Sequence, residues 1–265
     1  MLSLIFVKWL STTLVVVCVS LAAVRLGPKV GGVLAGTPIV LGPGYFFMIR
    51  EQSAPFVADA ALGSLHAMLA TLLFCFSYVL LAKRLGAVVS VACSALIWIL
   101  AAAIADQLPG GVFLALALFG ATLMLSRVYI NSIGLSSKPV SAPVRWGDLL
   151  VRGVLAGAVV CLATILLVNV DPAISGIALS FPIGMLTISL TLHQRYGVEV
   201  ARITLANTQL GMLSLVAFSA LLSLSIEVLP SNFAFWISLV LSLLVSTSLW
   251  LLSRGEIRRK VAGKF

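Results

Sequence analysis

Charged residues are scarce in this chain. Asp, Glu, Lys and Arg together make up 9% of its 265 residues, whereas an average soluble domain contains about 25%. Hydrophobic residues make up 61%, and a soluble domain of this length has too small an interior to bury so much apolar surface. The composition therefore excludes a soluble protein and indicates that lipid surrounds most of the chain.

Groups that catalyse reactions or bind metals are also rare. The chain has two histidines, eight carboxylates and four cysteines, and each cysteine stands alone in an apolar run without the CxxC spacing of a metal or redox site. It contains no Walker loop, nucleophile elbow, HExxH motif or dinucleotide-binding fingerprint. We therefore expect no enzyme, no cofactor and no metal site.

The net charge of +9 comes from short basic clusters between the apolar runs. It does not predict a nucleic-acid partner, because no stripe of Arg and Lys interleaved with aromatic residues is present. Basic clusters that flank membrane spans explain this distribution better. The expected partners are the lipid bilayer and a small-molecule solute, with a homo-oligomer or envelope-assembly partners as open alternatives.

Nine hydrophobic segments alternate with connections rich in Pro, Gly and polar residues. They cover residues 9–24, 30–49, 56–82, 85–105, 112–125, 149–170, 174–192, 200–226 and 233–252. A membrane-spanning helix needs about 20 apolar residues, so the fifth segment is short unless it continues to Ile130 and the Arg127 side chain extends to the interface. The sequence predicts an all-α, polytopic membrane protein with about nine transmembrane helices.

The basic residues also predict the topology. If all nine segments cross, 15 basic residues share the side of the C-terminus and only Lys8 and Arg50 face the other side; if the fifth does not cross, the count is 13 against 4. The positive-inside rule then places the C-terminus in the cytoplasm and the N-terminus in the periplasm of a bacterial inner membrane. Five carboxylates fall toward the periplasmic side: Glu51, Asp59, Asp106, Asp171 and Glu227.

The chain also repeats itself at an offset of 144 residues. Ungapped matches include Pro28 with Pro172, Gly32 with Gly176, and Pro38 with Pro182. We expect a four-helix repeat in residues 1–105, a linking helix and cytoplasmic linker in 106–148, and a second repeat with a basic tail in 149–265. One extra helix between two four-helix units inverts the second unit, which is a recurring architecture of secondary transporters.

One part of the second repeat resembles a known family. Residues 176–193, which contain Phe181-Pro182 and end at His193, are followed by Gly197 and Arg202. This order resembles the GlpM-like family of small bacterial inner-membrane proteins, which look like a single four-helix unit. The resemblance implies one such unit in residues 149–252 and a more diverged copy in the first half. It also implies an association with exopolysaccharide (alginate) production.

Two segments carry residues that interrupt helices. In the second segment, residues 42–44 read Gly-Pro-Gly, which removes a backbone donor and invites positive φ angles. The seventh segment has its own breakers in Gly176, Pro182 and Gly184, and Pro182 aligns with Pro38 of the second segment. Paired interrupted segments in the two halves of a chain indicate a transporter's binding site. The alternative is that these prolines only kink helices and the glycines only allow close packing. The substrate-path residues predicted here are Thr37, Pro38, Gly42, Tyr45 and Pro182.

Polar residues of the third and eighth segments complete the predicted site. Asp59, Gly63 and His66 share one helix face, and His66 lies about 15 Å into the membrane at 1.5 Å per residue. An imidazole at that depth suits proton-coupled transport, although a single interhelical hydrogen bond would also explain it. The eighth segment adds Arg202, Asn207 and Gln209.

These features predict a secondary transporter of a small polar or anionic solute. We expect His66 and Gln209 to line one cavity, because their helices correspond in the two repeats. An anionic or neutral solute would suit the partial positive charge at half-helix N-termini. The alternatives are a non-transporting membrane component of exopolysaccharide or cell-envelope assembly, and a passive channel. Polar groups such as Gln209 would then serve only to join helices.

Overall fold

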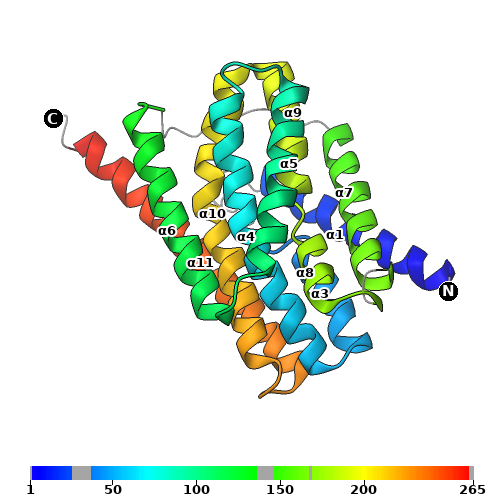
Figure 1. The fold of residues 1–265 in the computed structure, drawn as a ribbon. Helices are drawn as coiled ribbons and strands as arrows, with labels where there is room; N and C mark the ends of the chain where they lie inside the picture. The colour runs from blue at the N-terminus through cyan, green and yellow to red at the C-terminus, as the bar shows by residue number, and fades with distance from the viewer. Residues whose placement is uncertain (1, 26–36, 136–145, 167–168, 263–265) are drawn as a thin grey trace.

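The computed structural model describes residues 2–25, 37–135, 146–166 and 169–262, and within these ranges the chain forms helices and no strand (Figure 1). The first half contains α1 (Leu2–Arg25), α3 (Leu41–Glu51), α4 (Ala54–Leu81) and α5 (Ala87–Asp106), followed by α6 (Gly111–Ser132). The second half contains α7 (Trp146–Cys161), a π-helical turn η1 (Leu162–Leu166), α8 (Pro172–Leu179), α9 (Ile183–Tyr196), α10 (Val198–Ser225) and α11 (Ser231–Ala262).

Eight stretches of the described residues are long and apolar enough to cross a membrane, and the prediction of an all-α polytopic protein is confirmed. The fifth segment becomes α6, a helix of 22 residues that continues through Arg127. The guanidinium of Arg127 donates to the carbonyl oxygen of Ala206 at 3.0 Å, so α10 compensates this charge. Residues 136–145 of the expected cytoplasmic linker, and residues 30–36 of the second segment, lie outside the described residues.

Two pairs of corresponding helices begin at the same spacing. α10 and α11 start 144 residues after α4 and α5, respectively, and both α4 and α10 are 28 residues long. This is the spacing of the sequence matches between the halves. α6 lies between the two sets and has no counterpart in the described part of the chain.

α4 and α10 pack against each other at the centre of the bundle and run in opposite directions (Figure 1). At one end the hydroxyl of Ser223 donates to the carbonyl oxygen of Ala58 at 3.0 Å. At the other end Arg202 Nε donates to the carbonyl oxygen of Val79 at 2.8 Å. The corresponding long helices of the two halves are therefore antiparallel neighbours.

α1 and α7 form a second antiparallel pair. The hydroxyl of Thr13 donates to the carbonyl oxygen of Gly153 at 3.1 Å, and Cys161 Sγ lies 3.4 Å from the carbonyl oxygen of Ile5. A Cβ atom at Gly157 would lie 2.7 Å from a backbone oxygen of α1, so the missing side chain allows this close approach. Both pairs fit two halves that are inverted relative to each other.

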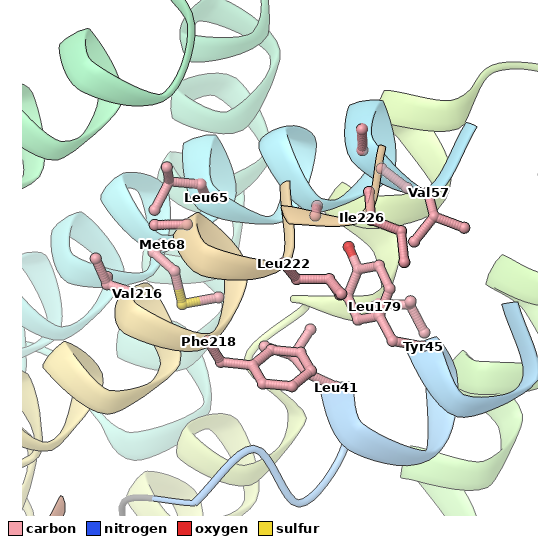
Figure 2. Packing of buried hydrophobic residues seen from close by; sticks show 14 of the residues in the cluster. Leu41, Tyr45, Val57, Leu65, Met68, Leu179, Val216, Phe218, Leu222 and Ile226 are labelled. Carbon is pink, nitrogen blue, oxygen red and sulfur yellow. The ribbon is translucent and has the colours of Figure 1, made fainter. Parts of the chain in front are cut away.

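A buried apolar cluster joins α3, α4, α8 and α10 (Figure 2). Tyr45, Leu65, Leu179 and Phe218 lie in this cluster with at most 1% of their surface exposed. In contrast, large apolar side chains are exposed on the outer helices, for example Phe113 and Leu125 of α6 at 76% and 72%. This arrangement suits a bundle whose outer surface contacts lipid.

Charges of opposite sign gather at the two ends of the bundle. We call the end at which α4 begins the acidic end, because Asp59, Asp106 and Asp171 lie together there. The opposite end, where α4 ends and α10 begins, holds Lys83, Arg84 and Arg202, and we call it the basic end. At 1.5 Å per residue, the 28 residues of α4 separate the two ends by about 40 Å.

Candidate functional site

The interruption expected in the seventh segment lies between α8 and α9. Pro182 precedes α9 and has no N–H with which to continue α8. The other end of α8 is capped by Asp171, whose side chain accepts hydrogen bonds from the backbone N–H groups of Ala173 and Ile174. α8 is thus a half-helix of eight residues with its N-terminus at the acidic end.

The second segment is not interrupted where we expected. Gly42, Pro43 and Gly44 form the first turn of α3, and neither glycine has a positive φ angle. Pro43 is tolerated because N–H groups in the first turn of a helix have no partner within that helix. Residues 37–40, which precede α3, are not helical, and the carbonyl oxygen of Pro38 accepts a hydrogen bond from the N–H of Gly42 at 2.7 Å.

The two interrupted segments meet inside the bundle. A Cβ atom at Gly44 would lie 2.5 Å from the Leu179 side chain, so the first turns of α3 contact the end of α8. Pro38 and Pro182 are both buried, and Thr37 is half-buried. These segments therefore face protein, as irregular backbone at membrane depth requires.

α8 also crosses α4 at a distance that only glycine allows. A Cβ atom at Gly176 would overlap the carbonyl oxygen of Ala60, and one at Gly63 would overlap that of Ala173. Small residues in both helices thus bring the two backbones into contact. Gly63, predicted to share a functional face with His66, is first of all a packing residue.

A chain of hydrogen bonds joins α3, α4 and α8 beside this crossing. The hydroxyl of Tyr45 lies 2.6 Å from Ser64 Oγ, and Ser64 Oγ donates to the carbonyl oxygen of Gly176 at 2.7 Å. Because Ser64 uses its proton in that bond, Tyr45 is the donor to Ser64. The Ser180 hydroxyl also donates to Gly176 at 3.0 Å. The predicted path residue Tyr45 is therefore fully buried and hydrogen-bonded.

A cavity of about 280 Å³ lies at the acidic end, between α4, the end of α5, the start of α6 and the start of α8. Its lining contains Asp59 and His66, two of the residues predicted for the substrate path, and also Asp106 and Asp171. His66 is only 8% exposed, and its Nδ1 lies 3.9 Å from Asp106 Oδ1. That separation is too long for a hydrogen bond, and Nδ1 has no other hydrogen-bond partner among the described residues.

The sequence singled out neither Asp106 nor Asp171 as a site residue. Both carboxylates adjoin the ends of apolar segments and were assigned to the same side of the membrane. This shared side was the feature of the sequence that could have indicated that they lie close together. Within the described residues, these side chains line the cavity without converging as a group of three or more metal ligands.

The predicted residues of α10 lie elsewhere. Gln209 is fully buried and accepts a hydrogen bond from the hydroxyl of Ser126 in α6 at 3.0 Å. It does not line the cavity of His66, and its Nε2 atom has no hydrogen-bond partner within the described ranges. Asn207 is half-buried, and Arg202 lines a second cavity at the basic end. The structure therefore does not bring His66 and Gln209 together.

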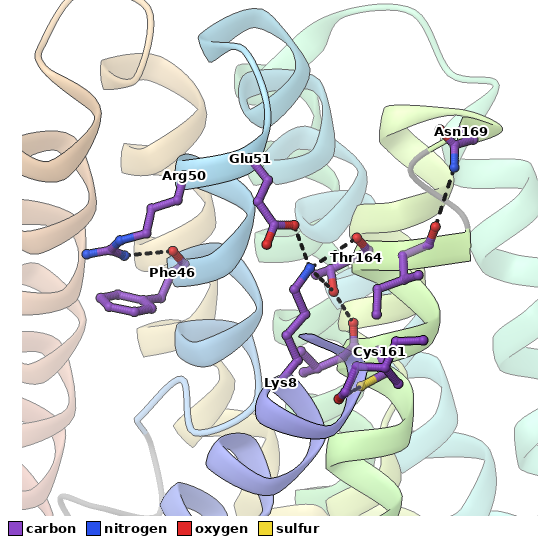
Figure 3. A network of polar contacts seen from close by, with 10 residues as sticks. Lys8, Phe46, Arg50, Glu51, Cys161, Thr164 and Asn169 are labelled. Carbon is purple, nitrogen blue, oxygen red and sulfur yellow. Dashed lines mark hydrogen bonds and ion pairs between the residues drawn. The ribbon is translucent and has the colours of Figure 1, made fainter. Parts of the chain in front are cut away.

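A buried lysine forms a further polar network, which the sequence did not reveal (Figure 3). Lys8 of α1 is fully buried, and its Nζ lies 2.5 Å from Glu51 at the end of α3. Nζ also lies 3.3 Å from the hydroxyl of Thr164, which belongs to the π-helical turn η1. The available signal was that Lys8 and Arg50 are the only basic residues assigned to the acidic side. The Arg50 guanidinium stacks on the Phe46 ring at 3.5 Å.

Polar groups within the spans thus collect at the His66 cavity, along the chain from Tyr45 to Gly176, and around Lys8. The first two adjoin the half-helix α8, and the third joins α1 to α3 and η1. Each network combines residues from both halves of the chain. The chain matches no protein-family profile, no curated protein and no solved structure.

Proposed function

We propose that this chain is a secondary transporter of a small polar solute in the bacterial inner membrane, and that His66 and Asp106 form its proton-carrying pair. One observation carries the proposal. A buried imidazole nitrogen, which has no hydrogen-bond partner among the described residues, faces a carboxylate in a cavity beside an interrupted helix. Ionisable residues inside membrane spans mark proton relays and substrate pathways.

The charge of the cavity favours proton uptake. Three carboxylates line it and no Lys or Arg of the described residues does, and a cleft lined by charge of one sign concentrates ions of the opposite sign. Imidazole titrates near neutral pH. His66 can therefore take up a proton that enters the cavity, and the resulting positive charge of the imidazole would lie beside the carboxylate of Asp106.

The same cavity argues against the anionic solute expected from the sequence. That expectation relied on a free half-helix N-terminus, but Asp171 already accepts hydrogen bonds from two N–H groups of α8. With Asp59 and Asp106 nearby, an anion would be repelled. We therefore propose a neutral or cationic solute. An organic cation is favoured over a metal ion, because the described residues contain no cluster of three or more His, Cys, Asp or Glu side chains placed to hold a metal.

The arrangement of the helices supports alternating access. Antiparallel pairing of α1 with α7 and of α4 with α10 fits two inverted repeats, which secondary transporters move against each other around a central site. The positive-inside rule places the acidic end in the periplasm and the basic end in the cytoplasm. The His66 cavity would then face the periplasm in this conformation.

Proton flux into proteoliposomes tests the proposal. Vesicles that contain the protein and an entrapped pH-sensitive dye would receive cationic amines, neutral polar solutes or organic anions in separate arms. We expect an amine or a neutral solute to drive proton movement, and His66→Leu and Asp106→Asn each to reduce it roughly tenfold or more, as loss of a proton-transfer group does. Leu210→Ala is the matched control, because Leu210 occupies the position in α10 that corresponds to His66.

Two outcomes would contradict the proposal. A proton flux in the His66→Leu protein equal to that of the wild type would show that His66 and Asp106 do not carry the proton. If no solute class drove a flux above that of empty vesicles, a non-transporting role in envelope assembly, which the GlpM-like resemblance implies, would be preferred. Reporter fusions after residues 135 and 265 should both report the cytoplasm, and a periplasmic signal at either position would overturn the orientation.

A further inference from the structure

A second cavity, of about 410 Å³, lies at the basic end of the bundle. It is formed where α4 and α6 end and α10 begins, so it is far along α4 from the His66 cavity. Its charged lining residues are Lys83, Arg84 and Arg202, and no carboxylate of the described part of the chain lines it. The proton-carrying pair uses none of these residues.

Arg202 forms the fixed part of this cavity. Arg202 is only 6% exposed. Its Nε donates to the carbonyl oxygen of Val79 at 2.8 Å, and one of its terminal nitrogens lies 2.6 Å from a carboxylate oxygen of Glu199. The Glu199 side chain is 56% exposed and lies outside the lining, so it offsets only part of the charge. Lys83 and Arg84 are exposed and can reorient toward a ligand. The cavity thus combines one positioned guanidinium with two mobile basic groups.

The side of the cavity formed by α6 is apolar and exposed. Leu125, Tyr129 and Ile133 follow one another at intervals of four residues and therefore lie on one helix face, with 72%, 44% and 39% of their surfaces exposed. Tyr129 is held by an edge-to-face contact with Phe76 of α4 at 5.5 Å. This stripe leads from the basic cavity toward the middle of the membrane. Aromatic residues such as Tyr129 commonly lie at the level of the lipid headgroups.

We propose that this cavity binds the headgroup of an anionic phospholipid, with an acyl chain along the stripe of Leu125, Tyr129 and Ile133. Basic pockets between helices on the cytoplasmic side bind anionic headgroups, and guanidinium and ammonium groups form charge-assisted hydrogen bonds with phosphate oxygens. A free phosphate ion shares the headgroup chemistry. It would make no use of an exposed apolar stripe that adjoins the basic groups, so the stripe favours the lipid. The site does not depend on whether the chain transports a solute.

Lipid titration of the full-length protein in non-ionic detergent, followed by native mass spectrometry, tests the site. We expect a retained phosphatidylglycerol molecule at concentrations at which phosphatidylcholine is not retained. The double variant Lys83→Gln/Arg84→Gln should weaken this binding roughly tenfold or more, because each basic group near the headgroup contributes to affinity. Both side chains are exposed, so the fold should survive, and an unchanged elution profile and melting temperature would verify this. Arg50→Gln removes an exposed arginine at the acidic end and is the matched control.

A second arm separates the two phosphate sources. Ile133→Ser leaves the basic groups in place and should weaken phosphatidylglycerol binding, while inorganic phosphate at millimolar concentration should fail to displace the lipid. Displacement of the lipid by inorganic phosphate, with no effect of Ile133→Ser, would assign the cavity to a soluble anion and overturn the lipid site. Equal losses in the double variant and in Arg50→Gln would show nonspecific attraction to the surface, which also overturns it.

Discussion

α4 and α10 are the same helix in length and position, yet their environments differ. Each has 28 residues, and α10 begins 144 residues after α4. Within the most apolar 18 residues of each helix, 67% of the residues of α4 are buried but only 50% of those of α10. α4 contacts α8 and α5 as well as α10 and α6, so it is the central helix of the bundle.

Their polar residues differ in the same way. Ser64 of α4 bonds across to α8, whereas Thr208, the corresponding residue of α10, bonds to the carbonyl oxygen of Thr204 in its own helix. His66 lines a cavity, whereas the corresponding Leu210 is 38% exposed toward the outside. At these two pairs of corresponding positions, the interhelical hydrogen bond and the cavity lining therefore belong to α4 alone, although the two helices begin at the repeat spacing.

Glycine replacement should break this comparison most strongly. Gly63 and Gly211 are the only glycines of α4 and α10, respectively. A Cβ atom at Gly63 would overlap the backbone of α8, while nothing lies within 4 Å of one at Gly211. Gly63→Leu should therefore lower the free energy of unfolding by more than about 4 kcal/mol, or prevent folding.

Gly211→Leu is the matched control, and it should change the stability by less than about 1 kcal/mol, because the new side chain meets open space and glycine is a weak helix former. Unfolding in mixed detergent micelles, followed by circular dichroism, would measure both variants. Equal losses in the two variants would show that α4 is no more tightly packed than α10.

Removal of one hydroxyl from each helix should give a smaller difference. Ser64→Ala removes the acceptor of the buried Tyr45 hydroxyl, while the Gly176 carbonyl oxygen keeps its bond from Ser180. Leaving one buried polar group unpaired costs about 1 to 3 kcal/mol. Thr208→Ala removes only a bond within α10 and should cost under about 0.5 kcal/mol. Melting temperatures of the purified variants would measure this difference. A decrease for Thr208→Ala as large as that for Ser64→Ala would count against a difference in polar contacts between α4 and α10.

The smallest effect is expected at Gln209. Its Nε2 is buried without a hydrogen-bond partner among the described residues, and only Ser126 donates to its Oε1. The double variant Gln209→Leu/Ser126→Ala removes donor and acceptor together, which is often nearly neutral. We expect a change in stability below about 1 kcal/mol and an unchanged proton flux in proteoliposomes. Loss of proton flux in a folded double variant would contradict this expectation. It would support the earlier prediction that Gln209 and His66 both belong to the solute path.

Sequence patterns were sufficient for the helices because lipid imposes a simple rule. A span must be apolar and about 20 residues long, so runs such as residues 85–105 and 233–252 predicted α5 and most of α11. The residue types at 42–44 were misleading, because Gly and Pro interrupt a helix interior but are tolerated in a first turn. Only the starting residue of α3 distinguishes the two cases, and apolar patterning locates such boundaries to within a few residues.

The candidate site was less predictable, because its contacts join distant residues. His66 was recognised from its depth, but its partner Asp106 adjoins the end of a different helix. Symmetry between the halves suggested that Gln209 would join His66. The unpaired helix α6 breaks that symmetry, since Ser126 of α6 binds Gln209 away from the cavity. A local pattern contains no information about such an insertion in the packing.

The network of Lys8 has a consequence for the order of events during synthesis. Glu51 leaves the ribosome 43 residues after Lys8, and Thr164 follows 156 residues after it. At a synthesis rate of about 5 to 20 residues per second, Glu51 is made roughly 2 to 9 s after Lys8, and Thr164 of the π-helical turn roughly 8 to 31 s after it. During that time the ammonium group of Lys8 must stay near the membrane surface on its flexible stem. The first helix of the chain can therefore reach its final position only after the second half has begun to enter the membrane.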